Sequence, residues 1–497
     1  IFGFDVKLPN MAYGAIARPP RLNAEILSAS PGDALDIAGV IDVVIQEGFV
    51  GVVAENRTAA YKGLEAVEIN WSEGDYIQQE DIIAMTRVGN ADPIVIQKEG
   101  RVKFDADTPV YTLEYKTGMA YHAHIEPQAA VADVQPDRID VWASTQAAMS
   151  LQSAIAEVLE REEAEIFVTP TYLGGGFGRK IEKKAAVEAA RLSAAVGRPV
   201  HIGWTREEDF QHGFVRPPTH NIFNATADEK GFITTIEHLQ ASGDVALPFL
   251  PEVAGNVLGA DFGAWRGATI PYAIPNIRTV AFRIQLPIPT GWWRGLGLFA
   301  NVFAIESFMD EFAAAYGADP VDYRLQQLAD DEKGTRFKNV LTDVAALSDW
   351  YGEREPDLGF GLAMSIDVNT VVALVAKVAV DDEEIIVKQI FASVDPGLII
   401  NPEGVRNQTL GAITMGVSAA LKEEVIVEDG VFVKDNFNDY PLLTMAESPE
   451  IIINLLSGAD QPYGMGEPPI GPVAAAIANA VYNLTGERLR ELPLKFA

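Results

Sequence analysis

Short apolar segments of strand length alternate with segments of helical spacing along most of the chain, and this alternation most constrains the fold. Phe49 to Ala54 is an apolar run of strand length, and Asn56 to Ala66 follows it with helical spacing. Arg138 to Ala143 alternates as a strand does, and Ser150 to Glu163 again has helical spacing. Further strands are predicted over residues 11–17, 67–71, 199–204, 371–380 and 385–393, and further helices over 181–196 and 472–484. The pattern predicts an α+β, α/β-rich fold in which helices cover sheets.

The chain has 497 residues, which is too many for one hydrophobic core, so several domains are expected. Residues 74–108 are acidic and polar, and residues 331–357 are charged, so both stretches predict irregular connectors. We therefore expect a small α/β domain over residues 1–75, a larger one over 76–335 and a third over 336–497. A membrane-spanning helix needs about 20 consecutive apolar residues, and the sequence has no apolar run close to that length.

The composition excludes several classes of site. A net charge of −32 makes nucleic acid an unsuitable partner, because phosphate binding needs a basic face. The same acidic surface suits simple solvation, a basic protein partner or a high-salt habitat. The chain has no cysteine, so disulfides, thiolate zinc and cysteine-ligated iron–sulfur clusters are excluded within it. The six histidines show no HExxH spacing, so a metal would be held by something other than a cluster of side chains.

The segment from Gly174 to Lys180 reads Gly-Gly-Gly-Phe-Gly-Arg-Lys and is followed at once by a predicted helix. Consecutive glycines let the backbone approach a ligand closely, and a helix start offers free N–H groups to an anion. Arg179 and Lys180 add positive charge. The spacing matches neither GxxxxGK[ST] nor GxGxxG. The alternative is a glycine turn that serves only tight packing.

The segment from Tyr463 to Pro469 contains one carboxylate, Glu467, between glycines and prolines. A carboxylate in apolar surroundings is a stronger general base near neutral pH. The segment therefore predicts a catalytic base at the start of the last helix. The alternative is a carboxylate that only stabilises that helix start through its dipole.

Arg294 lies between aromatic residues and glycines in the segment from Gly291 to Gly297. An arginine held in this way can direct its guanidinium at an anion or at a developing oxyanion. The alternative is a structural arginine stacked on tryptophan.

Two histidines, His122 and His124, stand two residues apart and are followed by Glu126. These residue types could ligate a metal ion. A strand or loop packed beneath the functional site is the favoured alternative.

Taken together and in this order, these segments resemble the xanthine dehydrogenase and aldehyde oxidase superfamily. The resemblance is closest to the branch of the isoquinoline 1-oxidoreductase beta subunits, which includes membrane-associated aldehyde dehydrogenases, and it extends from Phe2 to Pro493. Besides the glycine segment, it rests on Trp204–Asp209, Trp292–Gly297, Glu306–Glu311, Asp319–Arg324, Val394–Gly397, Gln408–Gly411 and Gly464–Pro469.

The resemblance implies a hammerhead-like α/β domain followed by two molybdenum-cofactor-binding domains, the second of them partial. It implies a molybdenum atom held through a pterin dithiolene, with a cytosine dinucleotide form among the expectations. The implied reaction is water-derived hydroxylation of an N-heteroaromatic or aldehyde substrate. Electrons would pass to a separate small subunit with [2Fe–2S] clusters and from there to a cytochrome c. Relatives carrying export signals imply a periplasmic or membrane-associated location, with the cytoplasm as the alternative.

The resemblance also assigns roles to residues of this chain. Glu467 would be the catalytic base that deprotonates a hydroxyl group at the metal, and Arg294 would lie beside the substrate or the cofactor. Gly176 and Phe177 would bring backbone near the apical oxygen of the metal. The remaining expected cofactor contacts are Gly175, Gly178, Arg179, Gln408 and Gly466.

One segment of the family pattern is missing, because no Gly-Gln-Gly occurs anywhere in the chain. In the resembling branch this stretch precedes the part that corresponds to Phe2 onward. We therefore expect a second polypeptide, or an N-terminal segment cut from the same precursor, to complete the pterin site. Two other functions stay open at this point. One is a hydrolase that uses Glu467 as its base, and the other is a cofactor-free structural or assembly subunit.

Overall fold

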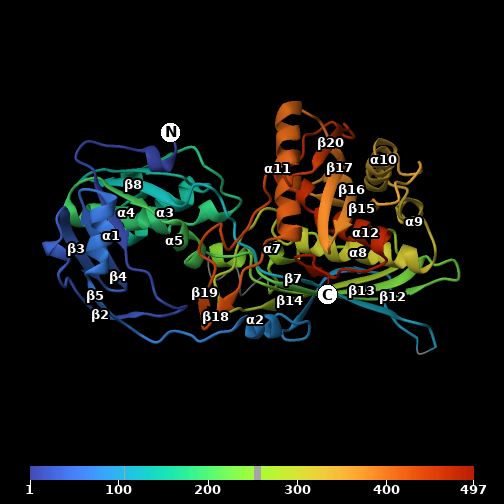
Figure 1. Ribbon diagram of the computed structural model, residues 1–497, viewed down its shortest axis with the longest axis horizontal. Coiled ribbons are helices and arrows are strands. Elements are labelled where there is room, and N and C mark those ends of the chain that lie inside the picture. Colours follow the sequence, from blue (N-terminus) through green and yellow to red (C-terminus); the bar gives the residue numbers. More distant parts are fainter. Residues whose placement is uncertain (106, 251–258, 497) are drawn as a thin grey trace. The chain divides into compact units, whose positions relative to one another are not determined.

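The computed structural model describes residues 1–105, 107–250 and 259–496. The chain divides into two compact units, each assembled from separate stretches (Figure 1). Unit 1 comprises Ile1–Asp81, Tyr121–Phe214 and Ile426–Asp439, and unit 2 comprises Ile82–Ala120, Val215–Val425 and Tyr440–Ala497. The predicted mixed α/β class is confirmed. The division into residues 1–75, 76–335 and 336–497 stays a prediction.

Unit 1 contains a sheet of seven strands in the order β10-β9-β8-β11-β1-β4-β3. The strands are β1 (Ala12–Ile16), β3 (Val40–Gln46), β4 (Phe49–Ala54), β8 (Ala129–Val134), β9 (Ile139–Ala143), β10 (Ile166–Pro170) and β11 (Val200–Gly203). Central strand β1 runs parallel to β11 and antiparallel to β4. The remaining elements are β2 (Ile26–Ser30), β5 (Glu68–Trp71), α5 (Arg206–Gln211), β18 (Val427–Glu428) and β19 (Val431–Phe432).

Helices cover both faces of this sheet. They are α1 (Arg57–Glu65), α3 (Ala148–Leu159) and α4 (Lys184–Val196). Ala12 and Ile16 of β1 share a buried core with side chains of α3 and α4. The intervening Ala15 instead packs with Ala59 and Ala60 of α1. Because successive side chains of a strand point to opposite faces, α1 lies on the face opposite α3 and α4.

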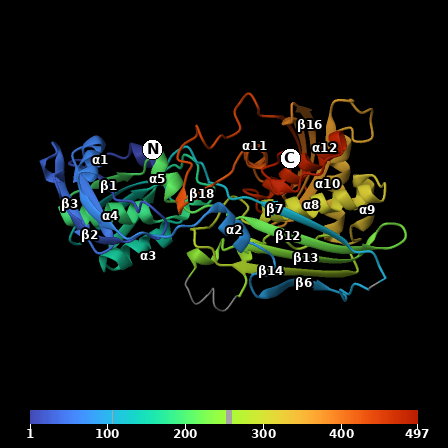
Figure 2. The same cartoon turned by 60° about the horizontal axis from the view of Figure 1, so that its bottom comes forward.

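Unit 2 contains two sheets. The first has six strands in the order β21-β7-β12-β13-β14-β6, and Figure 2 shows most of them side by side. They are β6 (Pro93–Glu99), β7 (Tyr111–Thr117), β12 (Thr219–Ala227), β13 (Ile233–Gly243), β14 (Asn276–Ile284) and β21 (Glu491–Leu492). The second sheet has the order β15-β16-β17-β20. Its strands are β15 (Gly359–Asp367), β16 (Thr370–Asp381), β17 (Glu384–Asp395) and β20 (Glu450–Leu455).

Two apolar helices pack against the sheets of unit 2 and belong to the same core. Helix α8 packs against β7, β12 and β15, and α12 packs against α8, β15 and β16 (Figure 1). Both contribute side chains to one continuous core, which includes Phe303 of α8 and Ile477 of α12. The helices of the unit are α7 (Phe262–Trp265), α8 (Leu298–Ala315), α9 (Pro320–Gln327), α10 (Glu332–Leu347), α11 (Pro402–Leu421) and α12 (Val473–Thr485). Helix α12 ends at Gly486, whose φ is 77°, as expected of a glycine cap.

Two stretches that were predicted to be irregular contain regular structure. Residues 74–108 contain helix α2 (Gln79–Met85) as well as strand β6. Residues 331–357 contain the four-turn helix α10, whose Phe337, Val340 and Val344 are buried. In both stretches a narrow apolar stripe suffices, because its partner surface comes from distant segments. No helix within the described residues combines the length and the hydropathy needed to cross a membrane.

Candidate active site

The loop that carries Glu467 is fixed to the second sheet of unit 2. Strands β15 and β16 are joined by a turn at Val368 and Asn369, both with positive φ. Thr370 Oγ1 at the start of β16 donates a hydrogen bond of 2.6 Å to the Gly464 carbonyl. A Cβ on Gly464 would lie 2.5 Å from Val368, so only glycine permits this approach. The sheet edge therefore sets the path of the chain into Glu467.

The Glu467 carboxylate has two polar partners, and this corrects the expectation of a lone carboxylate in apolar surroundings. The Gly295 N–H donates to its Oε1 at 3.0 Å, and Arg266 Nη1 lies 2.7 Å from its Oε2. The side chain keeps 34% of its surface exposed. Glu467 is the N-cap residue of a short 3-10 helix (Pro468–Ile470), and its side chain makes no capping hydrogen bond there. The carboxylate is positioned and remains open to a small reactant.

Arg294 holds this loop from the other side. Its Nε donates to the Gly466 carbonyl at 2.8 Å. Its Nη2 donates to the carbonyl and to Oε1 of Gln408, at 3.1 and 2.9 Å. Burial lowers the pKa of Arg294 to about 10, although the nearby Glu467 carboxylate opposes the shift. The structure thus brings together Arg294, Gln408, Gly466 and Glu467.

The stacking alternative for Arg294 is wrong. The guanidinium over the Trp293 ring belongs to Arg216, at 4.8 Å from the ring centroid. Arg294 instead donates hydrogen bonds to the carbonyls of Gly466 and Gln408 and to the Gln408 side chain. Its guanidinium therefore organises the loop.

The glycine segment lies in unit 1 and forms a tight, strained loop. Gly175, Phe177 and Gly178 have φ values of 89°, 54° and 104°, all in the region that favours glycine. Within the described part of the chain, the N–H groups of Gly175, Gly176 and Phe177 donate no hydrogen bond. The predicted immediate helix is wrong, because a 3-10 turn at Arg179–Ile181 intervenes before α4. Successive free N–H groups in such a loop form a concave site for an anion or an oxygen ligand.

The glycine loop rests on the segment of His122, His124 and Glu126. Glu126 accepts from the Gly174 N–H at 2.9 Å, the Gly3 N–H at 2.8 Å and Lys180 Nζ at 2.5 Å. The segment has no regular secondary structure and supports the glycine loop through Glu126. Among the described residues, no cluster of three histidine, aspartate or glutamate side chains could hold a metal ion.

Buried charge gathers beneath the glycine loop. Arg179 is 1% exposed, and its Nε and Nη2 have no hydrogen-bond partner among the described residues. Burial holds the pKa of His124 well below its ordinary value, and nearby Lys180 and Arg179 add to the effect. The carboxylate of Asp209 lies 3.3 Å from His124 and 3.6 Å from Arg179. The free N–H groups of the loop and the unsatisfied Nε and Nη2 of Arg179 are donors that fit an anionic cofactor.

Comparison with known proteins agrees with this chemistry. Residues 88–328 match one model described as a molybdopterin cofactor-binding domain, and residues 348–449 match a second model with the same description. Relatives named as xanthine dehydrogenase subunits also match. The chain belongs to the xanthine dehydrogenase family. It is a molybdopterin-binding member of that family, and the relatives it matches are named as oxidoreductases, as the sequence predicted.

Two relatives match the chain over almost its full length. The beta subunit of isoquinoline 1-oxidoreductase from Brevundimonas diminuta is 29% identical, with 99% of this chain and 66% of the relative covered. A subunit of nicotinate dehydrogenase from Pseudomonas putida is 30% identical, with 99% of this chain and 44% of the relative covered. The chain thus spans about half to two thirds of the length of these relatives.

A solved structure shows the same fold. Quinoline 2-oxidoreductase from Pseudomonas putida 86 superposes with a TM-score of 0.86 at 17% identity, covering 99% of this chain and 94% of the other. At this identity the likeness shows the fold.

Sequence reasoning missed two members of the Glu467 cluster, Arg266 and Asp367. One signal was available, because Trp265-Arg266-Gly267 repeats the tripeptide Trp293-Arg294-Gly295. Both glycines have positive φ, 79° and 87°, so both arginines precede a sharp turn. The Arg266 guanidinium forms an ion pair with the Glu467 carboxylate, and the Arg294 guanidinium donates a hydrogen bond to the carbonyl of Gly466.

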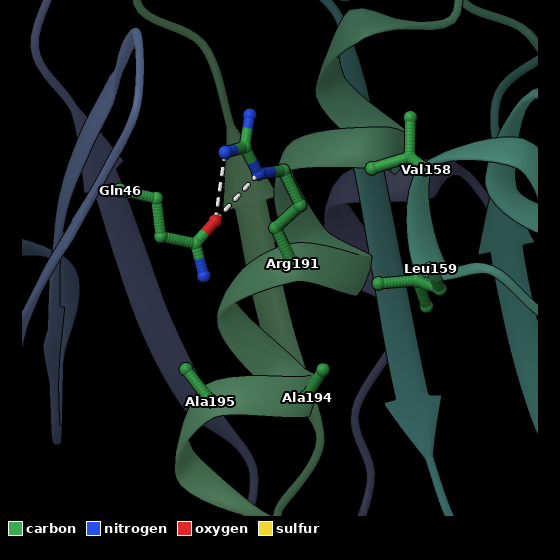
Figure 3. Close-up of a pocket in the computed structure, with 6 residues that line it drawn as sticks. All are labelled: Gln46, Val158, Leu159, Arg191, Ala194 and Ala195. Carbon is green, nitrogen blue, oxygen red and sulfur yellow. Dashed lines mark hydrogen bonds between the residues drawn. The ribbon is translucent and has the colours of Figure 1, made fainter.

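Unit 1 also contains a hollow of 410 Å³, which is lined by none of the residues of the Glu467 cluster or the glycine loop. Figure 3 shows Gln46 accepting hydrogen bonds from Nε and Nη2 of Arg191, at 2.9 and 2.7 Å. Its lining comprises Gln46, Val158, Leu159, Arg191, Ala194 and Ala195. The one charged group in this lining is already engaged, so the hollow supports no catalytic role.

Proposed function

We propose that this chain is the cofactor-binding part of a molybdenum enzyme that hydroxylates an electron-poor carbon of an N-heteroaromatic compound or an aldehyde. Water supplies the oxygen atom. The observation that carries the proposal is the Glu467 carboxylate, which is held on both oxygens yet 34% exposed. The names of the relatives, an isoquinoline oxidoreductase and a nicotinate dehydrogenase, support a heteroaromatic substrate.

Each predicted residue then has a task. Glu467 accepts the proton that the attacking water-derived oxygen must lose, as a positioned general base does. Arg294 keeps the Glu467 loop in place through Gly466 and joins it to Gln408. The N–H groups of Gly175, Gly176 and Phe177 offer donors to an oxygen ligand or the pterin, while Gly178 and the buried Arg179 hold the loop in shape. When bound, the cofactor supplies the two-electron acceptor and the sulfur ligands of the metal.

Electrons would leave through groups outside these 497 residues, because these residues include no cysteine to ligate a cluster. We propose a small [2Fe–2S] subunit, followed by a cytochrome c, in a periplasmic or membrane-associated complex. A second polypeptide or segment brings the Gly-Gln-Gly stretch that completes the pterin site, with the cytosine dinucleotide as the cofactor form. Both relatives are named as single subunits of larger enzymes, which supports a multi-subunit assembly.

Isotope labelling tests the reaction class. The purified complex should contain molybdenum, pterin and iron, and it should be incubated with isoquinoline or nicotinate and an artificial electron acceptor in H₂¹⁸O. We expect ¹⁸O in the hydroxylated product, because the base activates water. The same incubation in ordinary water under ¹⁸O₂ is the control and should give unlabelled product. A preparation with full molybdenum that hydrolyses substrates without oxidising them would contradict the proposal.

Glycine 178 provides a test of the glycine loop. At φ 104° an alanine side chain is strained by about 1–3 kcal/mol, so Gly178→Ala should displace the adjacent N–H groups. We expect molybdenum and pterin per chain to fall several-fold. Gly48→Ala is the matched control, since Gly48 also has positive φ (62°) but has nothing within 4 Å of its Cβ position. Equal cofactor content in the two variants would argue against a binding role for the loop.

A further inference from the structure

The guanidinium of Arg266 lies between two carboxylates. Its Nε and Nη2 donate to Oδ1 and Oδ2 of Asp367, at 2.7 and 2.5 Å, in a two-pronged ion pair. The remaining nitrogen, Nη1, lies 2.7 Å from Oε2 of Glu467. Side-chain exposure falls from 34% at Glu467 to 20% at Arg266 and 5% at Asp367. The three groups thus form a chain that runs from the open carboxylate into the protein.

The backbone at Arg266 is anchored independently of this ion pair. Asn301 on α8 is fully buried, and its Nδ2 donates to the carbonyls of Ala264 and Arg266, both at 3.0 Å. Asp261 caps α7 by accepting from the N–H groups of Gly263 and Ala264. The arginine therefore extends from a fixed point, and Asp367 then selects the orientation of its planar guanidinium.

The two oxygens of Glu467 have separate partners on separate elements. Gly295 N–H holds Oε1 and Arg266 holds Oε2, so the plane of the carboxylate is defined. A carboxylate that needed only charge neutralisation would not require a guanidinium that is itself oriented by a second, buried carboxylate. We propose that Arg266, oriented by Asp367, is a positioning residue that aims the Glu467 carboxylate. This inference rests on the proposed role of Glu467 as the base.

The charged groups around Glu467 determine in which direction its carbodiimide labelling should change when Arg266 is replaced. The charged groups that face it are Arg266, Arg294 and, behind Arg266, Asp367. Burial raises the pKa of Asp367, and the Arg266 guanidinium opposes that rise. Burial alone would lower the pKa of Arg266, but Asp367 and Glu467 hold it above its ordinary value. Arg266 therefore stays charged, and its loss would remove the ion pair that holds Oε2 of Glu467.

Carbodiimide labelling reports on the Glu467 carboxyl group without relying on turnover. The carboxyl oxygen adds to the central carbon of the reagent while a proton is taken up by its nitrogen, so labelling slows as pH rises. The holoenzyme would be labelled with a carbodiimide and an amine over a pH series, and the peptide containing Glu467 quantified by mass spectrometry. In Arg266→Met we expect the labelling curve to move to higher pH than in wild type. The acid limb of the kcat/KM profile should move the same way, with kcat/KM at the optimum reduced by about tenfold to a hundredfold.

Three further variants keep the test decisive. Arg266→Lys restores the charge, so its labelling curve should return toward wild type while its rate stays low, because lysine cannot form the two-pronged pair. Asp367→Asn should shift the curve less than Arg266→Met. Arg278→Met removes the same charge from β14, where Arg278 pairs with Glu237, and should leave labelling and rate unchanged.

Some outcomes would overturn the inference. An Arg266→Met enzyme whose labelling curve and kcat/KM both coincide with wild type would show that Arg266 does not act on Glu467. Failure of the proposed function gives a different result. A protein without molybdenum or oxidase activity would still show the labelling shift, whereas an active enzyme without the shift would reject only the positioning role.

Discussion

Glu467→Gln should reduce turnover by about 10²–10⁴-fold while molybdenum and pterin stay bound. Glutamine preserves the shape of the side chain and can still accept the Gly295 N–H bond, but it cannot take up a proton. Arg294 holds the loop through the Gly466 carbonyl, which the substitution does not touch, so the loop should keep its path. Single-turnover kinetics with metal analysis of the same preparation would measure the effect.

Glu403→Gln is the matched control for this variant. Glu403 lies exposed in the first turn of α11 and its substitution should leave turnover unchanged. A Glu467→Gln enzyme with full molybdenum and near-wild-type turnover would remove Glu467 from the role of base. It would also remove the chemical reason for the Arg266 and Asp367 arrangement.

Glu306→Ala should destabilise unit 2 by about 3–5 kcal/mol, since it leaves a buried charge without its partner. Glu306 and Arg324 have side chains 1% and 0% exposed, and Arg324 Nε donates to Glu306 Oε2 at 3.0 Å. The same carboxylate accepts from Tyr272 Oη at 2.6 Å and from the Met364 N–H at 3.0 Å. It therefore ties α8 to α9 and to strand β15. Chemical denaturation followed by a probe in unit 2 would show a lower midpoint.

Asp140→Ala is the control for the stability prediction. Asp140 also pairs with an arginine, Arg138, but that pair lies on the surface, with side chains 28% and 53% exposed. Exposed ion pairs contribute little to stability, so this variant should unfold close to wild type. If Glu306→Ala and Asp140→Ala had the same denaturation midpoint, the buried pair would be dispensable for the stability of the unit.

The sequence predicted those elements whose signal lies within the element itself. The apolar run of β4 (Phe49–Ala54) and the helical spacing of α12 with its terminal Gly486 are local signals, and both predictions are confirmed. Helix α10 was missed because its apolar stripe of Phe337, Val340 and Val344 is set among charged residues. This face is buried only because it packs against β16 and β17, which follow later in the chain.

The candidate site divides in the same way. Glu467, Arg294 and Gln408 stand in recognisable segments, and the structure groups them through hydrogen bonds. Arg266 and Asp367 stand outside those segments, and only the tertiary fold brings them to Glu467. The sequence also suggested an apolar setting for Glu467, because the nearest cation is contributed from about 200 positions earlier in the chain.

The spacing of these contacts has a consequence for how the protein is made. Arg294 meets Gly466, a residue 172 positions later, and meets Gln408 114 positions later. A ribosome that has just released the Arg294 segment has therefore not yet synthesised its partners. The loop around Glu467 acquires its shape only when the neighbourhood of α12 has emerged and folded back onto β15 and β16. Whatever delivers the cofactor to this loop thus meets it only after α12 has been synthesised.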